Sequence, residues 1–304
     1  MAKQKNYLFM VILAVAFIGI AMVFIEQCVL DRGFSLEKPF KFTIDTNIDM
    51  PEDQDEVTIL VYVTSPNNDY PLLKIYDLDC NGDGEFELKE VNKPYYCKFK
   101  RNTGKYQIWV RGTFPQIILC PDGADNWKAV VSVDDWGEAN WMCMDRFANN
   151  CQNLERIPQK APDLSRVEHL SWMFANAHKF NQPLNHWDVS NIKYMSSMFS
   201  EAISFDQPLD KWDVSNVTDM SSMFSGATSF NQSLDNWNVS NVTNMNEMFK
   251  DAKSFGDYPE NWVIPRLSRD MFTGTTLELV SKIYPLKRKE GPIRRGAPRK
   301  KEKK

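Results

Sequence analysis

Residues 180–199 read FNQPLNHWDVSNIKYMSSMF, residues 205–224 read FDQPLDKWDVSNVTDMSSMF, and residues 230–249 read FNQSLDNWNVSNVTNMNEMF. The three segments repeat one pattern at intervals of 25 residues. The recurring aromatic residues are Phe180, Phe205 and Phe230, together with Trp187, Trp212 and Trp237. A tandem array of this period predicts stacked structural units, each of which buries its apolar face against its neighbours.

The apolar spacing within one copy predicts a short helix followed by a short strand. Residues at intervals of three and four line one face of a helix. These residues are Val217, Met220, Met223, Phe224 and Ala227. An alternation typical of a strand follows, at Leu234, Trp237, Val239 and Val242. We therefore predict a leucine-rich-repeat-like α/β solenoid over residues 147–275.

One copy of the repeat buries too little apolar surface to fold without its neighbours. About eight apolar side chains at roughly 2 kcal/mol each oppose an ordering cost of about 1.5 kcal/mol for every residue of the copy. A single copy would not fold alone. We expect a core of Phe205, Trp212, Val217 and Met223, with Lys211, Asp213 and Asp219 facing water.

Recurring asparagines and degenerate end copies complete the array. Asn191, Asn216 and Asn241 would either form a ladder that satisfies backbone groups between copies or cap the predicted helices. Residues 147–174 and 255–272 are altered copies of the same pattern. Atypical terminal copies are what capping of a stack requires.

These motifs resemble a known family. The pattern F-N-Q-P-L, W-D-V-S-N-V, M-S-x-M-F is similar to the repeat of the BspA-type bacterial leucine-rich-repeat surface proteins, and residues 112–119, 131–141 and 147–154 resemble the segment that precedes those repeats. The resemblance covers residues 112–272. It implies an interaction protein outside the bacterial cytoplasm and supplies no ligand.

The N-terminal segment predicts a membrane anchor. Residues 7–25 carry no charge and follow Lys3 and Lys5, and 19 residues at 1.5 Å each make a helix of about 28 Å, long enough to cross a bilayer. We predict a signal anchor over residues 1–33, with the inner membrane as partner and the rest of the chain outside the cytoplasm, in the periplasm or at the cell surface. A cleaved secretory signal and a lipoprotein modified at Cys28 are the alternatives.

Residues 34–114 predict a small β-sandwich. Short strand patterns read FKFTID, VTILVYVTS, LLKIYDL, YYCKFK and KYQIWVRG, bounded by Pro, Asn and Gly. The order of the turn and the strands resembles the PKD-type, immunoglobulin-like module. Residues 115–146 would then form the lead-in and cap of the solenoid.

The turn at residues 79–90, DCNGDGEFELKE, matches a calcium-loop pattern. The ligand positions fall on Asp79, Asn81, Asp83, Glu85, Glu87 and Glu90, with Glu85 contributing its backbone carbonyl. Strand-like residues precede the loop and Pro94 restricts any exit helix. The alternative is a solvated acidic hairpin turn, and we predict no other cofactor.

The six cysteines suit an oxidising compartment. Cys80 and Cys97 flank the predicted hairpin, so adjacent strands would bring them within disulfide reach. Cys151 is expected to be a packed thiol. With Cys28 at the membrane edge, at least one cysteine should be free or intermolecular.

The C-terminal residues 276–304 predict a basic, disordered tail. Residues 282–304 carry a net charge of +9, which leaves −13 for the rest of a chain of net charge −4. The tail would either keep the protein soluble or hold anionic partners. No aromatic residues interleave the charges between 287 and 304, so specific nucleic-acid recognition is not expected.

Enzymatic motifs are not found in the sequence. The spacing of a zinc site is not found among His169, His178 and His186. The recurring Asp188 and Asp213 look like paired carboxylates, but the third copy has Asn238 at this position, which argues against a catalytic pair. We therefore predict an α+β multidomain protein with an N-terminal transmembrane helix, a β-sandwich and a solenoid, which is not an enzyme. It would mediate adhesion to a protein or polysaccharide at the cell surface; alternatives are a structural envelope protein without a ligand and a calcium-dependent adhesin.

Overall fold

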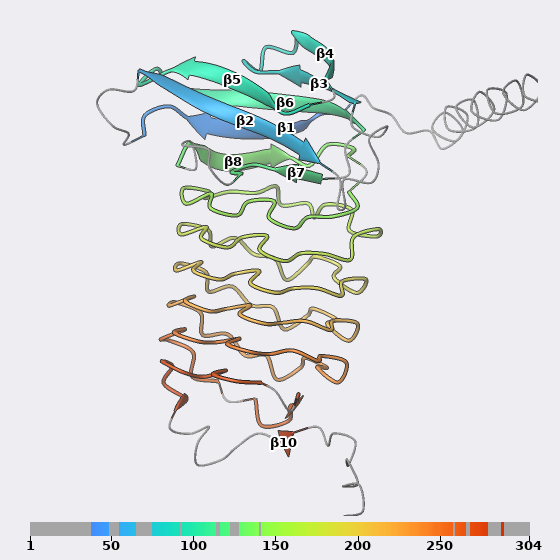
Figure 1. Cartoon of the computed structure of the whole chain (residues 1–304), viewed down its shortest axis with the longest axis vertical. Coiled ribbons are helices and arrows are strands. Elements are labelled where there is room, and N and C mark those ends of the chain that lie inside the picture. The colour runs from blue at the N-terminus through green and yellow to red at the C-terminus, as the bar shows by residue number, and fades with distance from the viewer. Residues whose placement is uncertain are drawn as a thin grey trace, which may run out of the picture. The chain divides into compact units, whose positions relative to one another are not determined.

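The computed structural model describes residues 38–48, 55–64, 75–91, 93–113, 116–121, 128–139, 141–257, 259–265, 268–278 and 287–288 (Figure 1). The chain divides into two units, Met1–Lys38 and Pro39–Lys304, and nearly all of the described residues belong to the larger one. The predicted anchor at residues 7–25 lies outside the described residues. In the larger unit, strands come first and the repeats follow them.

Antiparallel strands form two sheets before the repeats. The strands are β1 (Phe40–Asp45), β2 (Glu56–Thr64), β3 (Ile75–Asp79), β4 (Leu88–Val91), β5 (Tyr95–Lys100), β6 (Lys105–Thr113), β7 (Gln116–Ile118) and β8 (Val130–Asp135). One sheet has the order β4-β3-β6-β1-β8 and the other β5-β2-β7. β8 falls within the predicted lead-in at 115–146 and yet extends the first sheet, because it pairs with β1.

Alternating side chains explain these strands. In β1, Phe40, Phe42 and Ile44 are buried and the residues between them are half-buried. Buried residues of β2, such as Val57 and Ile59, belong to the same apolar cluster. Side chains along a strand point alternately to its two faces, so apolar residues at every second position place one face of the strand in the core.

Each repeat forms one coil of tight turns, and the coils are joined by backbone hydrogen bonds. Alternate amides of one coil donate to the next: Leu170 N to Tyr194 O (2.9 Å), Trp172 N to Ser196 O (2.9 Å), Phe174 N to Met198 O (2.9 Å) and Asn176 N to Ser200 O (2.8 Å). Intervening amides close turns within the coil, as Met173 N does on Leu170 O (3.2 Å). Figure 1 shows the coils lying one beyond another after β8.

Aromatic ladders fill the interior of the stacked coils. Phe180, Phe205, Phe230 and Phe255 stack with ring centroids 5.9 to 6.0 Å apart. Trp212 stacks on Trp237 and Trp237 on Trp262, each at 6.4 Å. The expected core residues Phe205, Trp212, Val217 and Met223 are all buried. Lys211 and Asp213 are exposed as predicted, whereas Asp219 is half-buried.

The predicted asparagine ladder is present. Asn216 Nδ2 donates to Ser190 O at 2.8 Å and Asn241 Nδ2 donates to Ser215 O at 2.7 Å. Asn191 Nδ2 bonds Ser165 O in the same way at 3.2 Å. Each side chain therefore satisfies a carbonyl of the preceding coil, and the alternative role as a helix cap does not apply.

The predicted α+β class and its helix-and-strand solenoid are wrong, because the elements of the described residues are β-strands. The amides that an α-helix would bond within the segment bond the next coil instead. Residues with positive φ also interrupt each expected helix, among them Ser197 (54°), Glu201 (57°) and Ser222 (54°). Left-handed residues cannot continue a right-handed helix. The predicted leucine-rich-repeat architecture is wrong for the same reason.

The predicted membrane placement also needs correction. Within the part of the chain that the structure describes, no helix has the length and apolar character needed to cross a bilayer. The structure thus gives no support to a membrane-anchored, extracytoplasmic protein, and that prediction is not carried forward.

A short strand pair follows the last coils. β9 (Val263–Ile264) pairs in parallel with β10 (Lys287–Arg288). Residues 287–288 lie in the segment for which we predicted disorder, so at least this part of the basic tail has a defined partner.

Candidate functional site

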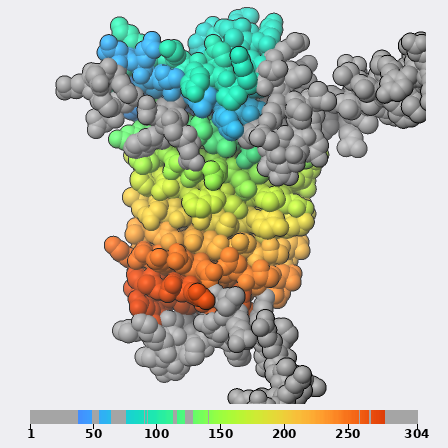
Figure 2. All heavy atoms as spheres, viewed as in Figure 1, coloured from blue at the N-terminus to red at the C-terminus, as the bar shows by residue number. Residues whose placement is uncertain are grey.

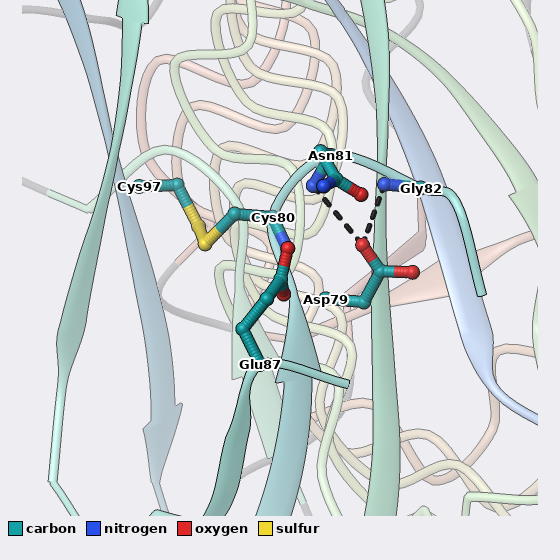
Figure 3. Close-up of a disulfide and its surroundings, with 6 residues drawn as sticks. All are labelled: Asp79, Cys80, Asn81, Gly82, Glu87 and Cys97. Atoms are coloured by element: carbon teal, nitrogen blue, oxygen red, sulfur yellow. Dashed lines mark hydrogen bonds between the residues drawn. A yellow bond between two sulfur atoms is a disulfide. The ribbon is translucent and has the colours of Figure 1, made fainter. Parts of the chain in front are cut away.

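The predicted calcium loop is a compact turn built around one buried carboxylate. Asp79 is fully buried. Its Oδ1 accepts the amides of Asn81 (3.0 Å) and Gly82 (2.6 Å), as Figure 3 shows, and its Oδ2 accepts the amide of Gly84 (2.9 Å). A Cβ at Gly82 would lie 2.6 Å from the carbonyl oxygen of Gln107, so only glycine fits there.

The remaining predicted ligands do not converge on a common point. Asn81 Nδ2 donates to Asp83 Oδ2 (3.0 Å), and Glu87 Oε2 accepts the amide of Cys80 (3.2 Å). Asn81, Asp83, Glu85 and Glu87 are exposed. Among the residues searched, which are the described ones, no three His, Cys, Asp or Glu side chains are grouped to hold a metal ion. The side chain of Glu90 lies outside that set, so calcium binding stays a prediction without structural support.

Two disulfides are present among the described residues, one of them predicted. Cys80 and Cys97 are bonded, with Cα atoms 5.6 Å apart (Figure 3). Cys151 is not a packed thiol but bonds Cys120, with Cα atoms 5.7 Å apart. The amide of Leu119 donates to Phe147 O at 2.9 Å, which brings the end of β7 against the first coil. That proximity depends on tertiary structure, and the sequence offered no signal for it.

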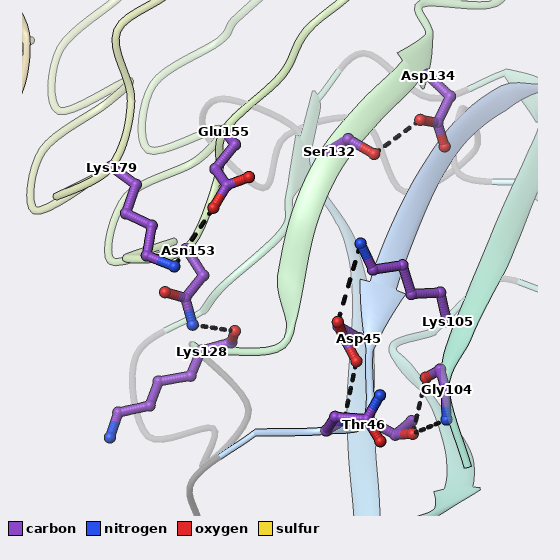
Figure 4. A network of polar contacts seen from close by, with 11 residues as sticks. Asp45, Thr46, Gly104, Lys105, Lys128, Ser132, Asp134, Asn153, Glu155 and Lys179 are labelled. Atoms are coloured by element: carbon purple, nitrogen blue, oxygen red, sulfur yellow. Dashed lines mark hydrogen bonds and ion pairs between the residues drawn. The ribbon is translucent and has the colours of Figure 1, made fainter. Parts of the chain in front are cut away.

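Further polar contacts join the sheets to the first coils. Asn153 Nδ2 donates to Lys128 O at 2.8 Å, just before β8, and Lys179 lies 3.3 Å from Glu155 (Figure 4). The amide of Val133 in β8 donates to Arg156 O at 2.9 Å. The first coil therefore continues the hydrogen bonding of the sheet.

A cysteine, an aspartate and a histidine meet where the array begins. Cys143 is buried and carries a free thiol, and its Sγ accepts the amide of Asp145 at 3.4 Å. His169 Nδ1 lies 3.6 Å from Asp145 Oδ2. Burial, with the nearby charge of Asp145, raises the pKa of the Cys143 thiol to about 12. A protonated, buried thiol is not a nucleophile, so this trio is not arranged for thiol catalysis.

Burial also raises the pKa of Asp145, while the charge of His169 opposes that shift. Asp145 Oδ1 accepts the amide of Ser171 at 2.6 Å. The carboxylate thus holds the next coil and orients His169. The pairing of His169 with Asp145 was not evident from the sequence.

Three ring-bearing residues lie on two adjoining coils, which Leu170 N to Tyr194 O and Trp172 N to Ser196 O join at 2.9 Å; we call His169, Trp172 and Tyr194 the aromatic edge. The rings of His169 and Tyr194 stack at 4.5 Å with an interplanar angle of 23°. Trp172 follows His169 by three residues and is 42% exposed, and Tyr194 is 39% exposed. The sequence already contained a signal for this site, because the later repeats carry small or polar residues where Trp172 and Tyr194 stand.

The recurring aspartates Asp188 and Asp213 have a structural role. Asp188 Oδ1 accepts the amide of Ser190 at 3.1 Å and Asp213 Oδ1 accepts that of Ser215 at 3.0 Å. Asn238 accepts the amide of Ser240 in the same way at 3.1 Å. These side chains cap turns, as their variation between Asp and Asn suggests.

Comparison with known proteins gives one similarity. Residues 142–262 match the family described as Mycoplasma protein of unknown function, DUF285. The match covers the repeats and less than half of the chain. No curated protein and no solved structure matches. The description gives no ligand, and the resemblance to BspA-type proteins stays a prediction.

Proposed function

We propose that this protein binds a macromolecular partner through the aromatic edge of its stacked coils and that it is not an enzyme. The observation that supports the proposal is the exposure of Trp172 and Tyr194 on a rigid array. Large aromatic side chains exposed on adjoining parts of a surface commonly mark contact sites.

The array supplies the rigidity that such a contact needs. Each coil is held to the next by several backbone hydrogen bonds, and the rings inside it are stacked. A preorganised surface loses little conformational entropy on binding. The protonated Cys143 thiol argues against the catalytic alternative.

Substitutions taken from sister coils give the sharpest test. Trp172→Ser and Tyr194→Asp install the residues found at the corresponding positions Ser222 and Asp219. Ile203→Thr, which copies Thr228, is the control, because Ile203 is 39% exposed away from the edge.

Immobilised full-length protein would be incubated with solubilised proteins and polysaccharides from whole cells, and retention measured by mass. We expect the edge variants to lose retention and Ile203→Thr to keep it. Equal retention by all variants would show that the edge is not the contact surface. Retention of no polymer by any variant would favour a structural protein without a ligand.

A further inference from the structure

Backbone geometry does not explain the tryptophan of the aromatic edge. Trp172 has φ of 61°, and the same position in later coils is held by Ser197, Ser222 and Glu247, all with φ between 54° and 57°. A bulky residue in the left-handed region is unfavourable. The fold therefore requires the conformation but not the tryptophan, so the exposed ring is not explained by the path of the backbone.

The stacked pair beside Trp172 also departs from the other coils. His169 and Tyr194 continue along the stack as Asp219 and Asn244, linked by single parallel bridges. The ring stack therefore ends at Tyr194, whose far side meets the coil that carries Asp219. The edge combines aromatic surface with an imidazole and a phenol hydroxyl, a mixture that binds amphipathic ligands.

Charges around the edge balance one another. Glu168 Oε1 lies 2.6 Å from Lys193 Nζ, and Asp145 Oδ2 lies 3.6 Å from His169 Nδ1. The positive charge of Arg146 also acts on Asp145. A strongly charged ligand would have to compete with these pairs, so the balance favours a neutral one.

The edge is small for a protein interface. A typical interface covers about 800 Å² on each partner, with an apolar centre. On the described coils, the other large apolar side chains that are exposed are Ile203 and Val263, which belong to other positions of the repeat. The strip is narrow, and two serines adjoin it: Ser171 precedes Trp172 in the chain, and the carbonyl of Ser196 accepts the Trp172 amide at 2.9 Å. Such a strip fits a thin chain better than a globular surface.

We propose that the ligand of the aromatic edge is a neutral glycan chain, whose pyranose rings stack on Trp172 and contact the exposed rim of the Tyr194 ring, and whose hydroxyls bond the polar groups beside them. The apolar C–H face of a pyranose complements an aromatic ring, and its hydroxyls need partners when they leave water. This inference rests on the proposed function and specifies the chemistry of the partner.

Calorimetric titration and saturation-transfer NMR of the full-length protein test the inference. The probes are cellotetraose and chitotetraose, with a heparin tetrasaccharide as the anionic comparison, each up to about 10 mM because single sugar sites bind weakly. We expect a neutral tetrasaccharide to bind at millimolar or lower concentration. Affinity should fall at least tenfold in Trp172→Ser and in Tyr194→Asp, and stay unchanged in Ile203→Thr, with thermal melting of every variant close to wild type.

The outcomes separate the glycan inference from the proposed function. Absence of saturation transfer from every neutral probe, a preference for the heparin fragment, or binding that survives Trp172→Ser would overturn the glycan assignment. A retained partner would also be tested after enzymatic deglycosylation. Retention that is lost supports the glycan, whereas undiminished retention that still requires Trp172 identifies a protein partner and leaves only the proposed function standing.

Discussion

Left-handed residues set the path of every coil. They recur in pairs four residues apart, as in Ser222 (54°) and Gly226 (71°). Gly226 has a second constraint, because a Cβ there would contact the carboxylate of Glu201 in the preceding coil. That carboxylate ends a flexible side chain and can move, so the backbone conformation should dominate the cost of substitution.

Gly226→Ala is therefore expected to lower the free energy of unfolding by about 1 to 2 kcal/mol, the cost of placing a Cβ in the left-handed region. Gly256→Ala is the matched control, since its Cβ would meet only ordinary contacts at 3.6 Å and beyond. Urea denaturation of both variants measures the difference. Equal stability of the two would show that the positive φ is not a constraint on the fold.

Aspartate caps should make stability depend on pH. Hydrogen bonds from the Ser190 and Ser215 side chains, followed by those from their amides, lower the pKa of Asp188 and Asp213. The bonds from Ser165 do the same to the pKa of Asp163. A lowered folded pKa adds stability above the unfolded pKa of about 3.9, and this stability is lost as pH falls through the folded pKa.

Replacing Asp163, Asp188 and Asp213 together by Asn removes this titration and keeps the cap, as Asn238 already shows. We expect the wild type to lose more thermal stability than the triple variant between neutral pH and about pH 3. If the melting temperatures of the wild type and the triple variant fell equally with pH, the three aspartates would not be the source of the pH dependence. Burial raises the pKa of Asp145, so its titration changes stability with pH in the opposite sense. Asp145 is present in both proteins, so it does not affect the comparison.

At the scale of one coil, the interior is a set of continuous ladders. Trp212 is buried, stacks on Trp237, and donates its Nε1 proton to Leu184 O at 2.9 Å. One side chain therefore contacts the coils before and after its own. Damage to it should spread along the stack.

Trp212→Ala should lower the free energy of unfolding by about 3 to 5 kcal/mol, from the cavity and from the carbonyl left without its donor. Lys211→Ala, at an exposed neighbour, should stay within about 0.5 kcal/mol of wild type. Chemical denaturation followed by circular dichroism compares them. A Trp212→Ala protein as stable as wild type would contradict the buried ladder.

At the scale of the whole described unit, the sheets and the coils share one structure. Buried residues from Phe40 in β1 to Leu277 form a single cluster, and the Cys120–Cys151 bond joins the end of β7 to the first coil. Figure 2 shows the coils as successive bands in the order of the sequence beyond the sheets.

Removing this disulfide, which closes 31 residues, with Cys120→Ala and Cys151→Ala should lower stability by about 3.7 kcal/mol on the chain-entropy scale. Removing Cys80 and Cys97 should cost about 0.5 kcal/mol less, because that bond closes 17 residues rather than 31. Peptide mapping without reductant establishes the pairing, and urea denaturation measures the losses. Recovery of Cys151 as a free thiol would disprove the second bond.

The sequence determined the repeat period, the residues that face inward, the Asn ladder and the Cys80–Cys97 pair, because each depends on a pattern that recurs or on residues near in the chain. It also placed the strands of β1, β2, β3, β5 and β6. Only the tertiary structure decided the path of the coils. Apolar residues at intervals of three and four suit a helix, but they also suit short turns with one face inward, and the choice depends on whether the amides bond locally or to the next coil. The Cys120–Cys151 bond and the meeting of Asp145 with His169 were decided in the same way, since both join residues of different elements that no local pattern relates.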